Sequence, residues 1–263
     1  MSGPAAVLAL VLAETATGAV AFLFLTPLWS EVKRGFFYLV GLVVMLLALA
    51  AAASAAAGFD TSTAPGGRQG TALAVALGAA TFGWLVLLRA RRVTMARWVG
   101  VATVPLAVAM LFAFARAIPE ALWLSFFQLL AGAVFSGAVL DGLLLGHWYL
   151  TDRKLPRGPI NRMAWFLLAA VALEAVAVIA GGIGARDQPG STSSSISPLL
   201  TVAGNATWIA VGMVACTGLI AAFIRASLKG SRPSAVQSAT GFFYLAVITA
   251  LTAELAAKVR FLP

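Results

Sequence analysis

The sequence has one cysteine and one histidine in 263 residues, and only 10% of its residues are charged. A single cysteine, Cys216, leaves no intrachain disulfide and no cysteine-based metal cluster. A single histidine excludes the HExxH motif of zinc hydrolases and a haem held by two histidines of this chain. The sequence also lacks a glycine-rich phosphate loop followed by lysine. Disulfide-stabilised secreted domains, zinc hydrolases and P-loop nucleotide hydrolases are therefore excluded.

Apolar residues dominate the chain instead, at 61% of the sequence with a mean hydropathy of +0.97. Lipid offers no hydrogen bonds to the backbone, so such a chain crosses a membrane as helices or as a closed barrel. The apolar runs are continuous and long enough for helices of roughly 20 residues. The sequence predicts a single all-α polytopic domain, 1–263, with eight membrane spans at approximately 4–28, 36–58, 71–90, 98–118, 120–150, 163–184, 198–224 and 236–257.

The basic residues are distributed unevenly among the loops. Loops on the cytoplasmic side of a membrane are enriched in lysine and arginine. Thirteen of the 18 basic residues fall in alternate loops, after the first, third, fifth and seventh spans. This asymmetry predicts that both termini face outward. The net charge of +9 therefore reflects the orientation of the chain in the membrane, and nucleic acid is not an expected partner.

Four acidic residues lie inside predicted spans: Glu14, Asp141, Glu174 and Glu254. A charge near the membrane centre costs about 2.5 to 3.5 kcal/mol even on lenient scales, so such residues are candidate sites. We expect Glu14 and Glu174 near the midplane without a neutralising lysine or arginine. They would handle protons, face a cofactor or a transported cation, or each donate one interhelical hydrogen bond. Lys258 follows Glu254 by four residues, which predicts a structural ion pair near the outer headgroups.

The only histidine lies in the stretch "LDGLLLGHWYLTDRKLPR", which starts at Leu140. His147 is followed by Trp148 and Tyr149 at the cytoplasmic boundary, as anchoring aromatic residues often are. With Asp141, the same residues could bind a lipid-soluble quinol head group, because histidine exchanges protons near neutral pH. His147 could instead supply a single ligand to a haem b iron. Asp141 and His147 project from different sides of the predicted helix, so they do not form a pair.

No metal site and no self-contained catalytic group is predicted. Ser54, Ser125 and Ser136 have no histidine within reach, and no extramembrane loop is long enough to house a soluble active site. The chain is therefore not expected to be catalytic by itself.

Three functions remain open. The first is an integral subunit of a bacterial redox or electron-transfer complex, whose basic cytoplasmic loops dock other protein subunits. Eight helices with little soluble mass are similar in kind to membrane anchor subunits of such complexes, which is an analogy of layout. The second is a proton- or cation-coupled small-molecule carrier, since transporter sites tend to lie at the midplane. The third is a membrane scaffold or assembly factor. The high alanine, glycine and arginine content favours a bacterial plasma membrane.

Overall fold

The computed structural model describes residues 3–59, 65–152, 154–182, 202–230 and 234–262, and these residues form helices and short connections. Eight of the helices are long and apolar enough to cross a membrane, which confirms the predicted all-α polytopic architecture. The helices are α1 (Gly3–Leu25), α2 (Leu28–Glu31), α3 (Arg34–Gly58), α4 (Pro65–Arg89), α5 (Val93–Ala115), α6 (Leu122–Thr151), α7 (Gly158–Ala180), α8 (Val202–Leu228) and α9 (Ser234–Val259).

Proline accounts for several helix limits. Pro65 begins α4 and Pro159 lies in the first turn of α7, positions where the missing amide hydrogen costs no helical bond. Pro27 follows the end of α1 and precedes α2, a single turn that the sequence did not predict. Pro105 lies inside α5 without ending it. In lipid, neighbouring helices tolerate such a proline, so it does not mark a broken helix here.

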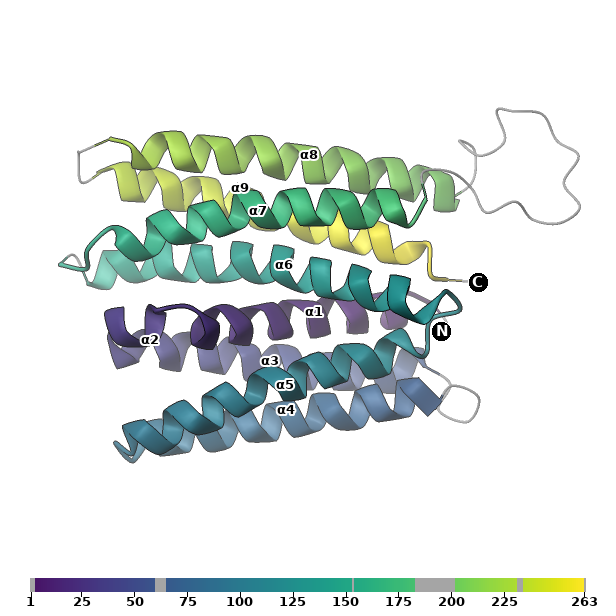
Figure 1. Cartoon of the computed structure of the whole chain (residues 1–263), viewed down its shortest axis with the longest axis horizontal. Helices are drawn as coiled ribbons and strands as arrows, with labels where there is room; N and C mark the ends of the chain where they lie inside the picture. The colour runs from purple at the N-terminus through teal and green to yellow at the C-terminus, as the bar shows by residue number, and fades with distance from the viewer. Residues whose placement is uncertain (1–2, 60–64, 153, 183–201, 231–233, 263) are drawn as a thin grey trace, which may run out of the picture.

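The helices form two groups of four long helices that lie side by side (Figure 1). In the first half, α1, α3, α4 and α5 pack in sequence order and α5 closes back onto α1. In the second half, α6, α7, α8 and α9 do the same, with α9 closing onto α6. Both ends of the chain lie at one end of the bundle, here called the terminal end (Figure 1). The opposite end is called the basic end.

The two halves meet mainly where α1 packs along α6, and this contact is called the seam. Glycine permits the close approach of the two helices. A Cβ atom at Gly18 would overlap the backbone of Ala133, and one at Gly137 would overlap the backbone of Gly18. Two other glycines of α6, Gly142 and Gly146, leave room for Phe243 and Thr240 of α9.

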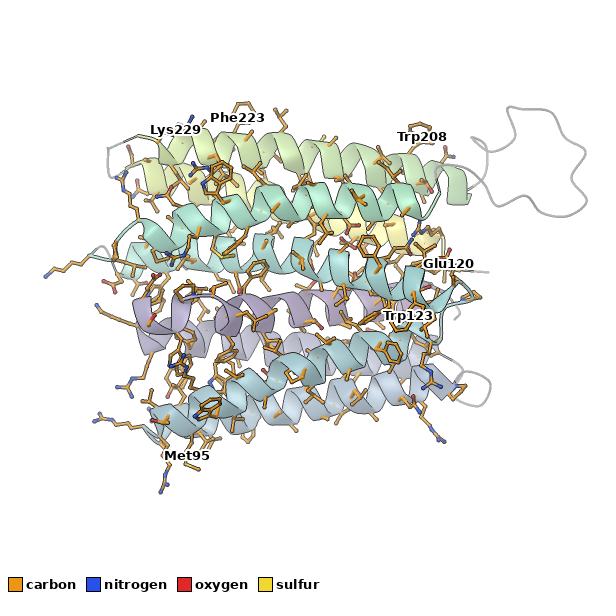
Figure 2. The ribbon with its side chains drawn as sticks, viewed as in Figure 1. Met95, Glu120, Trp123, Trp208, Phe223 and Lys229 are labelled. Atoms are coloured by element: carbon orange, nitrogen blue, oxygen red, sulfur yellow. The ribbon has the colours of Figure 1, made fainter. Side chains whose placement is uncertain are left out.

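The outer surface of the bundle carries the features of a lipid-facing protein. Apolar side chains such as Leu46, Phe82 and Ile248 are more than half exposed. Exposed tryptophans lie near both ends of the helices: Trp98 and Trp165 toward the basic end, Trp123 and Trp208 toward the terminal end (Figure 2). Such aromatic belts anchor a protein at the two interfaces of a bilayer. The chain is thus a multi-pass membrane protein in a lipid bilayer.

Candidate functional site

The centre of the candidate site is Lys258, one residue before the end of α9. Its side chain is buried, with 1% of the residue exposed. The ammonium nitrogen lies 2.9 Å from Glu254 Oε2, one turn earlier on α9, and 2.9 Å from Glu14 Oε1 on α1. Both carboxylates are fully buried. Lysine therefore joins two acidic side chains that are 240 residues apart in the sequence.

The contact between Glu14 and Lys258 corrects a sequence-based expectation. Glu14 was expected to have no cationic partner, because no lysine or arginine occurs in the middle of a predicted span. That expectation was wrong, since Lys258 lies near a helix end and its four-carbon stem brings the ammonium group to Glu14, midway along α1. The predicted pair of Glu254 and Lys258 is present, but both residues are buried in the bundle rather than exposed near the headgroups.

Glu174 brings a third carboxylate to the same region from α7. The residue is 2% exposed and lies within electrostatic range of Glu254, Lys258 and Arg260. Arg260 follows α9 and packs its guanidinium group against Gly181 at the end of α7, where any Cβ atom would overlap it. Three acids and two bases from α1, α7 and the α9 region thus form one group, called the acid–lysine cluster: Glu14, Glu174, Glu254, Lys258 and Arg260.

Helix α6 supplies the wall against which the cluster packs. A Cβ atom at Gly132 would lie 2.8 Å from Glu14 Oε1 and 2.8 Å from Glu254 Oε2, the same two oxygens that contact Lys258. A larger residue at this position would displace at least one of the two carboxylates. One turn toward the terminal end, Gln128 is buried, and neither of its amide atoms has a hydrogen-bond partner among the described residues.

Unsatisfied polar atoms continue around the cluster. Glu174 Oε2, Glu254 Oε1 and the hydroxyl of Ser125 are buried without a hydrogen-bond partner in the part of the chain that the structure describes. Leaving a buried polar group unpaired costs about 1 to 3 kcal/mol, so native cores contain few of them. Their concentration beside buried charges makes this region a candidate functional site.

The fourth intramembrane acid stands apart from the cluster. Asp141 lies on α6, nine residues beyond Gly132 toward the basic end, which corresponds to roughly 14 Å along a helix. It is fully buried, and neither carboxylate oxygen has a hydrogen-bond partner within the described ranges. Asp141 is thus an isolated acidic residue inside the bundle, separate from the acid–lysine cluster.

The aromatic residues proposed with Asp141 do not converge on it. His147 is exposed on the surface of α6, near the basic end. The ring of Trp148 packs against Gly35 and Phe36 of α3, and the hydroxyl of Tyr149 donates a hydrogen bond to Pro156 O at 2.5 Å. His147 and Asp141 therefore lie on different sides of α6, one at the surface and one in the core. The described residues contain no group of three or more histidine, cysteine or acidic side chains that could hold a metal.

The basic end holds two further ion pairs between the halves. Lys33, just before α3, lies 2.9 Å from Asp152 at the end of α6. Glu31 of α2 pairs with Arg162 of α7. The two pairs are reciprocal, since each half supplies one acid after its first long helix and one base near the start of its second long helix. The sequence showed these charges only as loop residues.

Comparison with known proteins adds no assignment to this geometry. No protein-family model matches the chain, and no curated protein or solved structure matches it at a significant level.

Proposed function

We propose that the chain is a proton-coupled carrier of small molecules, in which the acid–lysine cluster binds the coupling proton. The observation that carries this proposal is the Glu14–Lys258–Glu254 arrangement, buried in the membrane and built from both halves of the bundle. Parallel repeats of helices are a common plan for carriers, with the binding site between the repeats. The acid–lysine cluster likewise lies between the two halves of the bundle, since Glu14 comes from the first half and Lys258 from the second.

The charge balance of the cluster favours one exchangeable proton. Glu14, Glu174 and Glu254 carry three negative charges when ionised, and Lys258 and Arg260 carry two positive charges. One uncompensated charge in lipid costs about 2.5 to 3.5 kcal/mol or more, which a single proton on any of the three carboxyls removes. Lys258 already occupies the position between two carboxylates that a metal cation would need. A proton is therefore favoured over sodium or potassium as the coupling ion.

The ion pairs that join the halves within the described residues suit alternating access. One pair, Glu14–Lys258, holds the seam toward the terminal end, and two pairs hold it at the basic end. Protonation of Glu14 would weaken its attraction to Lys258 and allow the halves to separate there. The pairs at the basic end would then hold the opposite side closed.

The pairs differ in strength because they differ in exposure. The Lys33 side chain is 73% exposed and that of Asp152 is 9% exposed, and the side chains of Glu31 and Arg162 are 30% and 37% exposed, so each pair reaches solvent. Pairs of this kind are worth about 0 to 1 kcal/mol each. The Glu14–Lys258 pair is buried on both sides, and breaking such a pair costs several times more. Opening at the basic end is therefore the easier of the two movements.

The distribution of basic residues sets the proposed orientation. Among the described residues, the exposed cations at the basic end are Lys33, Arg34, Arg89, Arg91, Arg92, Arg97, Lys154 and Lys229. Lysine and arginine are retained on the cytoplasmic side, which favours a bacterial plasma membrane with both termini outward. Figure 2 labels Lys229 at this end and Glu120 at the other.

The same surface favours a second candidate, an integral subunit of a bacterial redox or electron-transfer complex. The exposed cations described at this end would attract an acidic partner subunit and steer its docking. In this alternative the acid–lysine cluster would pass protons to or from a quinone or haem centre. His147 and Trp148 lie in the last turn and a half of α6, close to the docking face.

Reconstitution of the purified chain tests the carrier function. Proteoliposomes with a pH-sensitive dye inside should show a lumenal pH change when a transported compound is added from a panel of uncharged amphipathic molecules. The change should be lost in Glu14→Gln and retained in Lys33→Gln, which removes an exposed charge of the basic end. A chain that isolates with a redox-active partner and moves no protons alone would favour the second candidate.

A further inference from the structure

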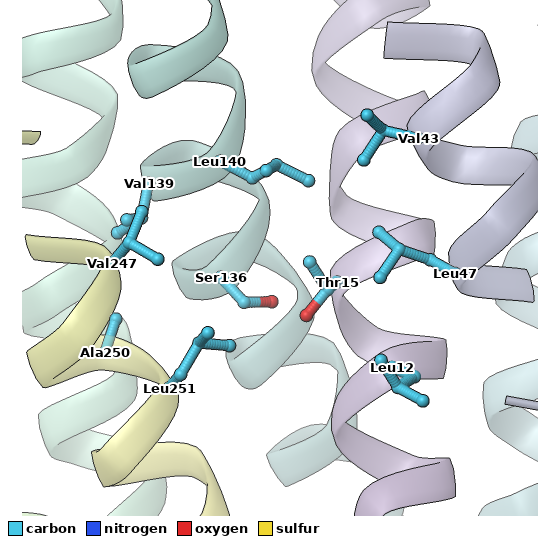
Figure 3. Close-up of a pocket in the computed structure, with 10 residues that line it drawn as sticks. All are labelled: Leu12, Thr15, Val43, Leu47, Ser136, Val139, Leu140, Val247, Ala250 and Leu251. Carbon is cyan, nitrogen blue, oxygen red and sulfur yellow. The ribbon is translucent and has the colours of Figure 1, made fainter. Parts of the chain in front are cut away.

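A cavity of about 150 Å³ lies beside the seam, and four helices line it. Leu12 and Thr15 come from α1, Leu47 from α3, Ser136 from α6 and Leu251 from α9. Figure 3 shows Thr15 and Ser136 directed toward each other across it, with apolar side chains around them. The cavity therefore combines an apolar wall with two hydroxyl groups at one place.

The cavity lies in the middle of the membrane and next to the acid–lysine cluster. Thr15 and Leu47 are close to the midpoints of α1 and α3, and Ser136 is at the midpoint of α6. Thr15 follows Glu14 directly, and Ser136 lies one turn after Gly132, which touches the cluster. Leu251 is 37% exposed, so this side of the cavity borders the lipid. A lipid-soluble molecule would enter sideways.

The two hydroxyl groups have a defined hydrogen-bonding character. Thr15 Oγ1 donates its proton to Val11 O at 2.7 Å, and Ser136 Oγ donates its proton to Gly132 O at 2.7 Å. A hydroxyl has one donor and two acceptor lone pairs, so what remains for a ligand is acceptor capacity. The cavity is thus suited to a ligand that donates a hydrogen bond.

Its size limits the ligand further. An apolar protein cavity of about 150 Å³ accepts a benzene ring. A molecule with one ring in the cavity and an apolar tail in the lipid would bury the ring and place one hydroxyl group between Thr15 and Ser136.

We propose that this cavity binds the hydroxylated ring of a lipid-soluble phenol or quinol. The ligand O–H donates to Thr15 or Ser136, the ring packs against Leu12, Leu47 and Leu251, and the tail extends between α3 and α9. Use of the cavity as the substrate site rests on the proposed carrier function, whereas binding itself does not.

Equilibrium binding tests the proposal with two probes that differ in one donor. Radiolabelled 4-hexylphenol and 4-hexylanisole are measured on the full chain in lipid nanodiscs, with empty nanodiscs subtracted. We expect saturable binding of the phenol and about five- to tenfold weaker binding of the anisole, the effect of one hydrogen bond. Thr15→Val combined with Ser136→Ala should reduce the phenol affinity to that of the anisole. Leu47→Trp should abolish saturable phenol binding by filling the cavity.

Neighbouring residues provide matched controls. Thr252→Val removes a hydroxyl of the same type from the lipid face of α9, and Leu46→Trp adds the same bulk one residue away on the lipid face of α3. Both controls should leave phenol binding unchanged, and thermal unfolding of each variant checks folding. Equal binding of phenol and anisole, or phenol binding that survives Leu47→Trp, overturns the proposal. Glu14→Gln should still bind phenol, so loss of transport alone would count against the carrier function and not against the cavity.

Discussion

Replacement of Lys258 by methionine is the sharpest perturbation of the acid–lysine cluster. Methionine keeps an unbranched side chain of comparable length and removes the charge. Lys258 is 1% exposed, and its ammonium group lies 2.9 Å from two buried carboxylates. Removing one partner from a buried ion pair costs about 3 to 5 kcal/mol, because the remaining charge stays uncompensated.

Thermal unfolding in a mild detergent measures this loss. For a chain of this size, 1 kcal/mol corresponds to roughly 2 to 4 °C in the unfolding midpoint, so Lys258→Met should lower the midpoint by roughly 6 to 20 °C. Lys33→Met is the control, because Lys33 pairs at the same 2.9 Å but is 73% exposed. Its midpoint should move by less than about 4 °C.

A double variant separates the charge effect from a packing effect. Adding Glu14→Gln to Lys258→Met removes one of the carboxylates left without a cation, so part of the lost stability should return. The reasoning is refuted if Lys258→Met unfolds at the wild-type temperature. It is also refuted if the double variant loses more stability than the two single variants lose together.

Two further predictions concern the seam and the orientation. Gly18→Ala should lower the free energy of unfolding by about 1 to 3 kcal/mol, since its Cβ overlaps Ala133, whereas Gly212→Ala, with open space around it, should have little effect in the same unfolding assay. In a Cys216→Ser background, a membrane-impermeant maleimide applied to intact cells should label Arg68→Cys but not Lys154→Cys. The reverse pattern would invert the proposed orientation.

The fold could be predicted from the sequence because lipid allows few backbone structures. The predicted spans agree with the eight long helices to within six residues at every described end. The single turn α2 was missed, since four residues carry no periodic signal. The close approach of α1 and α6 at Gly18 and Gly137 was not predicted, because a glycine in the sequence does not tell which helix packs against it.

The composition of the site was predicted only in part. The buried acids were recognisable because each interrupts an apolar run, but the partner of Glu14 was not. Lys258 lies at a helix end, where a lysine ordinarily extends toward the headgroups. Its inward direction depends on how α9 crosses α1, and this tertiary relation leaves no local pattern. The pairing of Glu31 with Arg162 was hidden for the same reason.

The role of His147 stays a prediction. Its rarity and its aromatic neighbours drew attention to it, yet sequence spacing alone does not reveal which face of a helix meets lipid. The side chain is exposed, while Asp141 on the same helix is buried. A site that needs both residues would require a partner subunit at the surface of α6.

Infrared spectroscopy of the carboxyl groups tests most directly whether the acid–lysine cluster holds a proton. The Asp141→Asn variant serves as the reference, because it removes the isolated buried carboxyl from the spectrum. At neutral pH this reference should show a protonated carboxyl band that is insensitive to the external medium. The band should disappear when Glu14→Gln is added, since two acids and two bases then balance. A reference spectrum without the band, or a band that persists after Glu14→Gln, would contradict the account.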